Sequence, residues 1–366
     1  MLKNKNPKIL ISPLDWGLGH ATRCIPIIKL LLQNNFRVAV ASCGSPLKVI
    51  QTEFPNIEYI HFPSVTINYS GKIPAFLHIT FQIPKILFGI CREKFLIRKI
   101  IKKHDIDLII SDNRYGVFSK KIPSIFITHQ IAIKLPKSLI FFEPVLYKIH
   151  KKIISKFDKV FIPDIEGKDN ISGDLSHRFP KPKNAIFIGI LSRFEYKPEN
   201  EIKYDLLVII SGPEPDRTYF YMNMLYAILV SGLKTLILTG LPQENYRYKS
   251  NNITTVSHLK TAEMQEVINS SETIICRSGY SSIMDLLTLN KKAILIPSKG
   301  QTEQEYLAEF HHKKNSFIKQ DIENIDIKKG IEELEVLKPA QNNYFLNKNI
   351  ILKTINDLLF KNEKKL

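Results

Sequence analysis

The chain has 366 residues, more than one hydrophobic core usually supports, so two domains are expected. Hydrophobic residues make up 44% and charged residues 24%, which excludes a disordered or collagen-like chain. Lysine and arginine outnumber aspartate and glutamate by 52 to 35, and the formal net charge of +17 favours an anionic partner. A nucleic acid, a phospholipid surface or a phosphate-bearing substrate would each fit, and so would a general drift of composition towards lysine.

The chain has four cysteines without a pairing or metal-binding spacing: Cys24, Cys43, Cys91 and Cys276. We therefore expect a reduced, cytoplasmic protein. Pro13 and Asp15 interrupt the first apolar run, so no signal peptide is expected. No window approaches the ~20 uninterrupted apolar residues that a membrane-spanning helix needs.

The chain opens with an apolar run at 9–12, a loop at 13–20, a helical pattern at 21–33 and a second apolar run at 36–42. This order predicts a βαβ unit. The loop contains Gly17-Leu-Gly19, but Thr22 replaces the third glycine of a dinucleotide-binding fingerprint. His20 ends the loop at the sheet edge where ligands bind, which makes it a candidate general base, with a structural histidine as the alternative.

Strand-like runs recur at 57–60, 108–111, 125–128, 160–163 and 185–190, with helical patterns between most of them. This alternation predicts a mostly parallel sheet covered on both faces. Asp112, Asn113 and Arg114 follow one of these strands and His129 follows another, so all four would face the crevice that contains His20. Asp112 would orient the imidazole, unless it only caps a turn.

A polar, charged stretch at 192–203 precedes a second α/β series, and we interpret it as an interdomain linker. Strand-like runs of this second series lie at 206–210, 234–240, 253–256, 273–276 and 293–296. The predicted organisation is a Rossmann-like domain at 1–191, a second at 204–338, and a C-terminal helix with a basic tail at 339–366. Both domains would have doubly wound parallel sheets and face a central cleft.

The stretch from Thr273 to Asp285 carries the strongest indication of a site. A β-branched apolar run stops at Arg277-Ser-Gly279, and a helical pattern follows. Gly279 allows close approach of a ligand, and Ser281 begins a helix whose N–H groups and dipole favour an anion. Asp285 lies one turn further on and offers a carboxylate to sugar hydroxyls. An ordinary strand-to-helix connection with a glycine turn is the alternative.

A second place for a phosphate follows the first strand of the second series, at Ser211-Gly212-Pro213. No Gly-Lys-Ser/Thr follows it, so it is not a P-loop. Two basic amphipathic patterns, at 85–103 and 139–154, are typical either of helices on an anionic membrane or of domain helices with a solvated face.

Several motifs together have a counterpart in a known family. They are Cys276-Arg-Ser-Gly279, Asp285, Pro297 and Gln301-Thr-Glu-Gln-Glu305 in the second half, with Gly17-Leu-Gly-His20 and Gly189-Ile-Leu-Ser-Arg193 in the first. On these residues the chain resembles a GT-B glycosyltransferase and, more narrowly, glycosyltransferase family 28. The best known member of that family adds N-acetylglucosamine to a lipid-linked peptidoglycan intermediate.

The resemblance implies roles for individual residues. The donor diphosphate would bind near Arg193 and Gly279, the ribose at Asp285, the base near Leu259, and the transferred sugar at Gln304 and Glu305. The full donor-binding set is Arg193, Ser211, Gly212, Leu259, Arg277, Ser278, Gly279, Ser281, Asp285, Gln304 and Glu305. His20 and Asp112 would be catalytic, and the acceptor side would comprise Asp15, Gly17, Gly19, Asn113, Arg114 and His129.

Three departures from the family's pattern affect the donor site: Asp285 replaces the usual Glu, the diphosphate loop is reduced to Ser211-Gly-Pro213, and Gln304-Glu305 replaces paired glutamines. The expected reaction is inverting, metal-independent transfer from a nucleoside-diphosphate sugar, UDP being the first candidate, to a hydroxyl of an envelope glycolipid or saccharide. No cofactor and no metal are expected. The protein would be cytoplasmic, with an anionic membrane surface or a lipid-linked acceptor as partners.

Two other functions stay open: a nucleotide-sugar epimerase on the same fold, and a non-catalytic basic scaffold on membrane or nucleic acid. No nucleic-acid-binding motif is readable in the sequence, so no nucleic acid is expected as a partner.

Overall fold

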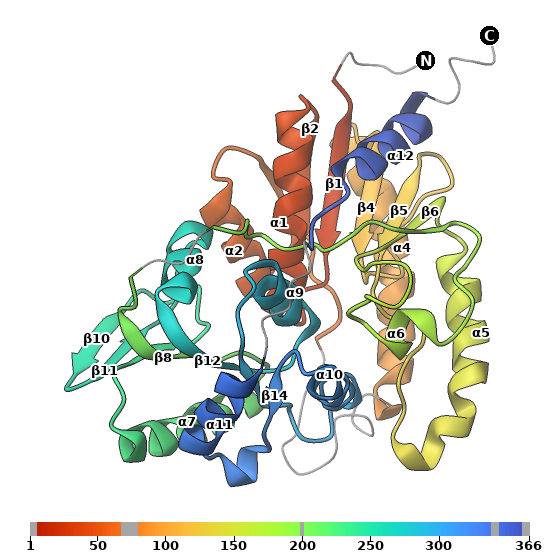
Figure 1. Ribbon diagram of the computed structural model, residues 1–366. Helices are drawn as coiled ribbons and strands as arrows, with labels where there is room; N and C mark the ends of the chain where they lie inside the picture. Colours follow the sequence, from red (N-terminus) through yellow and green to blue (C-terminus); the bar gives the residue numbers. More distant parts are fainter. Residues whose placement is uncertain (1–5, 67–79, 198–200, 338–343, 361–366) are drawn as a thin grey trace.

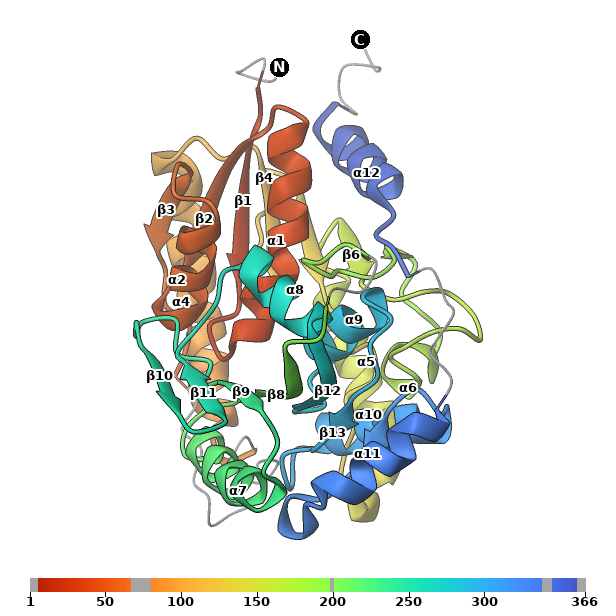
Figure 2. The same cartoon turned by 60° about the vertical axis from the view of Figure 1, so that its left-hand side comes forward.

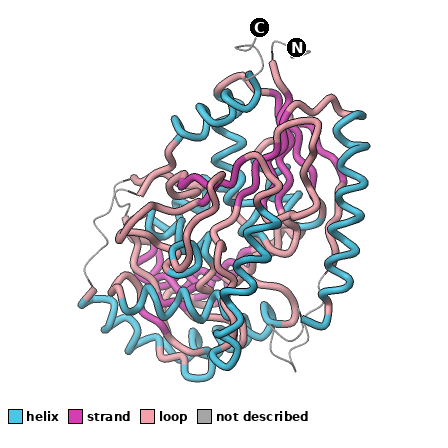
Figure 3. The backbone as a smooth tube through the Cα atoms, turned by 90° about the vertical axis from the view of Figure 1, so that its right-hand side faces the viewer, coloured by secondary structure: helices cyan, strands magenta, loops and turns pink. Residues whose placement is uncertain are grey.

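The computed structural model describes residues 6–66, 80–197, 201–337 and 344–360. Residues 198–200 of the expected linker, and 339–343 and 361–366 of the expected tail, lie outside this part. The chain forms two α/β lobes (Figure 1), and the strands gather in two separate groups in Figure 3. Each lobe is built round a seven-stranded sheet.

The first sheet has the order β3-β2-β1-β4-β5-β6-β7 and is parallel throughout. Its strands are β1 (Lys8–Pro13), β2 (Arg37–Ser42), β3 (Glu58–His61), β4 (Leu108–Asp112), β5 (Ser124–Ile127), β6 (Lys159–Ile162) and β7 (Ala185–Phe187). The central strands are apolar at nearly every position because helices cover both faces of the sheet.

The helices of the first lobe are α1 (Leu18–Gln33), α2 (Gly44–Glu53), α4 (Ile83–Lys103), η1 (Lys137–Phe142), α5 (Glu143–Ile154) and α6 (Asp174–His177). On one face of the sheet, Ile9 and Ile11 pack against α1. On the opposite face, Leu10 packs with Ile97 of α4, and Phe126 packs with α5. Alternate strand residues therefore bury into opposite layers.

The second sheet has the order β10-β11-β9-β8-β12-β13-β14. Its strands are β8 (Tyr204–Ile209), β9 (Thr235–Leu238), β10 (Arg247–Ser250), β11 (Ile253–Val256), β12 (Ser271–Cys276), β13 (Ile294–Leu295) and β14 (Ile318–Lys319). Its helices are α7 (Asp216–Ser231), α8 (Thr261–Asn269), α9 (Tyr280–Thr288), α10 (Thr302–Lys313), η2 (Ile322–Asn324) and α11 (Ile327–Val336).

Only β10 runs antiparallel among the strands described in this sheet. Every residue of β10 is exposed, so it lacks the apolar alternation that marks a half-buried strand, and its sequence pattern did not predict it.

The last helix, α12 (Lys348–Phe360), returns to the first lobe, as Figures 1 and 2 show. The segment before it pairs with the chain after β7, where the Ile190 amide donates to the Phe345 carbonyl at 3.2 Å. A glycine is required at Gly189, because φ is +76° and a Cβ would lie 2.2 Å from that carbonyl oxygen. Ile351 and Ile355 of α12 are fully buried, so this helix belongs to the core of the first lobe.

Ile355→Ala should therefore reduce the free energy of unfolding by about 3 kcal/mol, because it leaves a cavity under α12. The control Asn356→Ala changes an exposed neighbour and should cost less than about 0.5 kcal/mol. Urea unfolding followed by circular dichroism would measure both. Equal stability of the two variants would show that α12 does not contribute to this core.

Candidate active site

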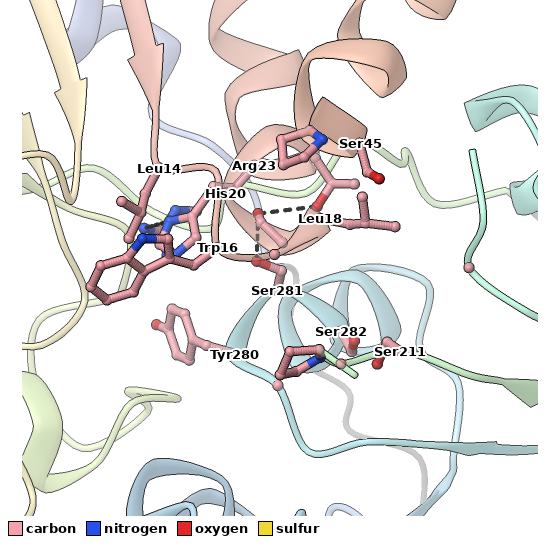
Figure 4. Close-up of a pocket in the computed structure, with 18 of the residues that line it drawn as sticks. Leu14, Trp16, Leu18, His20, Arg23, Ser45, Ser211, Tyr280, Ser281 and Ser282 are labelled. Atoms are coloured by element: carbon pink, nitrogen blue, oxygen red, sulfur yellow. Dashed lines mark hydrogen bonds between the residues drawn. The ribbon is translucent and has the colours of Figure 1, made fainter. Parts of the chain in front are cut away.

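A cavity of about 790 Å³ lies between the lobes and is lined by residues of both. In each lobe it meets the carboxyl ends of the parallel strands, the edge at which α/β sheets bind ligands. Figure 4 shows Trp16, His20 and Arg23 of the first lobe facing Tyr280, Ser281 and Ser282 of the second. The cavity therefore contains both halves of the expected site.

His20 lies in the first turn of α1, and its side chain lines the cavity. Its Nδ1 atom is 3.0 Å from Oδ1 of Asp112, because β1 and β4 pair in parallel and end together. Burial and the positive charge of Arg23 lower the pKa of His20 below 6.5, although Asp112 acts in the opposite direction. The imidazole is therefore neutral at neutral pH and able to accept a proton.

Asp112 is fully buried behind His20 and does not line the cavity. Burial by itself would raise the pKa of its carboxyl, but Arg23 and His20 outweigh burial and hold the pKa below its ordinary value. An ionised carboxylate at Nδ1 orients the imidazole so that Nε2 is left for a substrate proton.

Arg23 joins His20, Asp112 and His129 in one cluster of polar contacts, and the sequence did not lead us to predict it. Its Nε donates to Asp112 Oδ2 at 2.6 Å, its Nη2 lies 2.8 Å from His20 Nδ1, and its Nη1 lies 3.1 Å from His129 Nδ1. A helical spacing of three residues puts Arg23 and His20 on one face of α1, so the spacing was an available signal.

Glu303, in the first turn of α10, extends this cluster into the second lobe. Its Oε1 lies 2.9 Å from Nε2 of His129, and its other oxygen accepts a hydrogen bond from Gln130. Tyr280 stacks on the His129 ring with centroids 4.0 Å apart and planes within 4°. Glu303 lies inside the Gln301–Glu305 motif and Tyr280 inside the stretch from Thr273 to Asp285, but neither was assigned a role, because only the packing of one lobe on the other brings them to His129.

Gly279 is the N-cap of α9, as the turn pattern suggested, and it lines the cavity. The hydroxyl of Ser281 donates to the carbonyl oxygen of Gly19 at 2.9 Å, a contact between lobes that is marked in Figure 4. A Cβ at Gly19 would lie 3.0 Å from the Ser281 oxygen, so the absence of a side chain allows this close approach. Gly17 also lines the cavity.

Arg193 and Asp285 lie together at the cavity, with Nε and Oδ2 3.7 Å apart. The Nε and Nη1 atoms of Arg193 are buried and lack a hydrogen-bond partner in the described structure. Burial raises the pKa of the Asp285 carboxyl, and Arg193 and the Ser192 hydroxyl, 2.6 Å away, offset this only in part. Guanidinium donors that make no hydrogen bond, at a cavity, suit a phosphate oxygen.

Other expected residues also line the cavity: Asp15, Asn113, Arg114, His129, Ser211, Gly212, Leu259 and Gln304. Arg114 is nevertheless committed to internal contacts, an ion pair with Glu93 at 2.8 Å and a hydrogen bond to the Phe62 carbonyl at 2.8 Å. Trp16, the single tryptophan, lines the cavity as well, although it was not predicted.

Arg277 was expected to bind the donor, but its side chain is 1% exposed and does not line the cavity. It donates to the Pro297 carbonyl and to Asp216, both at 3.0 Å, and lies over the Phe220 ring. The guanidinium holds β12 to the start of α7, which is a structural role.

Ser278 and Glu305 were also expected to bind the donor, but neither residue lines the cavity. The Ser278 hydroxyl donates to the Gln304 carbonyl at 2.8 Å, and Glu305 accepts from the Gly300 amide at 2.7 Å. Helical periodicity turns Glu305 away from the cavity that Gln304 and Glu303 line.

The fold consists of two doubly wound lobes, with His20 on one side of the cavity between them and Arg193 on the other. Residues 232–358 match the model of the glycosyltransferase family 28 C-terminal domain. An uncharacterized glycosyltransferase of Methanosarcina acetivorans is 23% identical over 321 residues, covering 81% of this chain and 81% of the relative.

Solved structures agree on the architecture. The glycotransferase of kitacinnamycin has a TM-score of 0.63 at 13% identity and covers 91% of both chains. A Listeria monocytogenes protein assigned as a UDP-N-acetylglucosamine 2-epimerase has a TM-score of 0.57 at 11% identity, covering 97% of this chain and 96% of that one. The expected resemblance is confirmed: the chain is a glycosyltransferase of GT-B type whose second lobe resembles family 28.

The two arginines should respond differently to replacement by methionine. Arg277→Met should lower the free energy of unfolding by about 2 kcal/mol, less than for a fully buried pair because Asp216 is partly exposed. It should leave the affinity for UDP unchanged. Arg193→Met should weaken UDP binding at least ~10-fold through loss of charge-assisted hydrogen bonds. Urea unfolding and calorimetric titration would measure these quantities, and weaker UDP binding by Arg277→Met would restore Arg277 to the donor site.

Proposed function

We propose that the protein transfers a sugar, with an N-acetylhexosamine as first candidate, from a nucleoside-diphosphate donor to an acceptor hydroxyl with inversion. The observation that carries this proposal is the His20–Asp112 pair, whose imidazole shares one cavity with Arg193, Asp285 and the N-terminus of α9. UDP is the proposed nucleotide because of the likeness of residues 232–358 to family 28.

In the proposed reaction, Nε2 of His20 takes the proton of the acceptor hydroxyl as its oxygen attacks the anomeric carbon. The bond from that carbon to the diphosphate breaks on the opposite face, and the diphosphate leaves with the bonding electrons. Arg193 and the N–H groups at the start of α9 stabilise the charge that develops on the leaving group.

We propose that this stabilisation needs no metal ion. Within the described residues, no three His, Cys, Asp or Glu side chains gather as a metal site would require. The proposal itself rests on Arg193, whose unpaired donors supply positive charge at the cavity.

His20→Ala should reduce kcat for transfer from UDP-N-acetylglucosamine by at least ~100-fold, because a general base contributes about that much. Binding of UDP, followed by thermal shift, should be nearly unchanged. The wild-type kcat/KM should be level at neutral pH and fall only below pH 6.5, because the base works unprotonated and its pKa is lowered. Survival of transfer in His20→Ala, or an epimerised sugar formed without acceptor, would contradict the assignment.

We further propose that the acceptor is lipid-linked and that the first lobe lies on an anionic membrane. Large apolar side chains are exposed on α4, η1 and α5: Ile83, Leu87, Phe88, Phe95, Ile140, Phe141, Phe142, Val145 and Ile149. The described residues include no helix long and apolar enough to span a bilayer. An interfacial contact is therefore the kind of membrane association that these helices support.

Two features connect this surface with the cavity. Ile86, Gly89 and Ile90 of α4 line the cavity, while Leu87 and Phe88 are 56% and 73% exposed. The same helix continues with basic residues at Arg92, Lys94, Arg98, Lys99, Lys102 and Lys103, which suit anionic head groups. A lipid-linked acceptor could thus pass from the membrane along α4 to His20.

The double variant Leu87→Ser, Phe88→Ser should reduce binding to vesicles with about 30% anionic lipid by ~10-fold or more, because it removes apolar area from the interface. Reversing the charge at Lys94, Arg98 and Lys102 should do the same at low salt. The control Leu229→Ser, Val230→Ser alters side chains of α7 that are 64% and 72% exposed and should leave binding unchanged. Equal flotation of all these variants would rule out the proposed surface.

A further inference from the structure

A chain of hydrogen bonds between polar side chains runs from the second lobe to the proposed base. It begins at Glu303 of α10 and passes through His129 and Arg23 to Asp112 and His20. Arg23 and His129 are 2% and 4% exposed, and Asp112 is fully buried. Glu303 is the one member that the second lobe contributes, so the chain is complete only when the lobes are together.

The direction of the hydrogen bonds follows from their partners. Arginine can only donate, so Nδ1 of His129 accepts from Arg23 and carries no hydrogen. The hydrogen of the neutral ring is then on Nε2, which donates it to Glu303 Oε1 at 2.9 Å. Glu303 thus favours the tautomer of His129 whose Nδ1 accepts a hydrogen bond from the guanidinium of Arg23.

Two groups compete for Nδ1 of His20. Asp112 Oδ1, 3.0 Å away, would accept a hydrogen from this nitrogen, whereas Arg23 Nη2, 2.8 Å away, would donate one to it. Only the first arrangement leaves Nε2 of His20 unprotonated for catalysis. Contacts that hold Arg23 towards His129 therefore favour the reactive tautomer of His20.

The charges of the cluster lead to the same conclusion. With both imidazoles neutral, one guanidinium faces two carboxylates, Asp112 and Glu303, and the cluster has a single negative charge. When His20 takes a proton, two positive charges balance two negative ones. Without Glu303, the protonated His20 and Arg23 would share only Asp112, an unfavourable arrangement in a buried site.

The other titratable groups around His20 do not supply that missing charge. Cys24, behind Asp112, has a pKa raised well above 9 by burial and by Asp112, so it is a neutral thiol. Tyr280, which stacks on His129, has a pKa raised well above 10, with burial as the main cause, so it is a neutral phenol. Glu303 keeps a pKa below its ordinary value, because His129 and Arg23 outweigh its burial.

We propose that Glu303 is a positioning residue that, through His129 and Arg23, makes His20 a stronger base when the two lobes are closed. The inference rests on the proposed glycosyl transfer, in which His20 takes the proton of the acceptor. The lobe that carries the donor site thereby also activates the base, so proton transfer is favoured in the closed enzyme and disfavoured when the lobes separate.

The pKa of His20 can be measured without turnover by NMR of protein labelled with 13C at histidine Cε1, the His20 signal being identified by its loss in His20→Gln. Glu303→Gln, which has the same shape, should lower the pKa of His20 by about one unit relative to wild type. Glu303→Asp keeps the charge and should restore most of that difference. Thr302→Val is the matched control, because it removes another contact between lobes, the 2.9 Å hydrogen bond to the Lys134 carbonyl, without changing charge.

The same variants should also differ in how kcat/KM for the acceptor depends on pH. In Glu303→Gln the acid limb should move to lower pH by about one unit, and the plateau should fall ~3-fold or more because the base is weaker. Thr302→Val should keep the acid limb of the wild type. Thermal melting would confirm that each variant is folded.

The outcomes distinguish this inference from the proposed function. A lowered pKa of His20 in Glu303→Gln, in a protein that transfers no sugar, would support the cluster and refute the transfer. Transfer by the wild type with an unchanged pKa of His20 in Glu303→Gln would overturn the role of Glu303. A rise in KM for the donor with no shift of the acid limb would also overturn it, because Glu303 would then contact the sugar.

Discussion

The ion pair between Asp112 and Arg23 is the interaction on which the site depends. Asp112 has no exposed surface, and a carboxylate without solvent needs a charge partner and hydrogen bonds to stay ionised. Arg23 supplies both from the adjacent helix, at 2.6 Å from Oδ2. Because the carboxylate is ionised, it can orient His20, while burial and the positive charge of Arg23 lower the pKa of the imidazole.

The two lobes divide the chemistry between them. The first lobe carries His20, the proposed proton acceptor, and the surface of exposed apolar side chains on α4, η1 and α5, and the second carries the glycine turn before α9. Arg193 comes from the connection between the lobes and lies against Asp285. These parts lie round one cavity, where burial strengthens the interactions between charges.

The lobes also contact one another through polar groups at the cavity itself. Ser281 bonds to Gly19, and Glu303 bonds to His129 and Gln130. Such contacts are specific in geometry, and a single hydrogen bond contributes only about 1 kcal/mol net. An interface of this kind suits an enzyme that must open to exchange substrates and close to react.

The sequence by itself determined the class of fold, because β-branched apolar runs that alternate with helical patterns can be buried only as parallel sheets between helices. It also placed His20, Asp112 and Gly279 just after strands, and Asp285 in the helix that follows Gly279, since these positions depend on local sequence. Only the tertiary structure decided which polar side chains reach the cavity. Arg277 belongs to the same motif as Gly279, but its side chain points into the core. Glu303 lies 174 residues beyond His129 in the chain, so no local pattern encodes the contact between them.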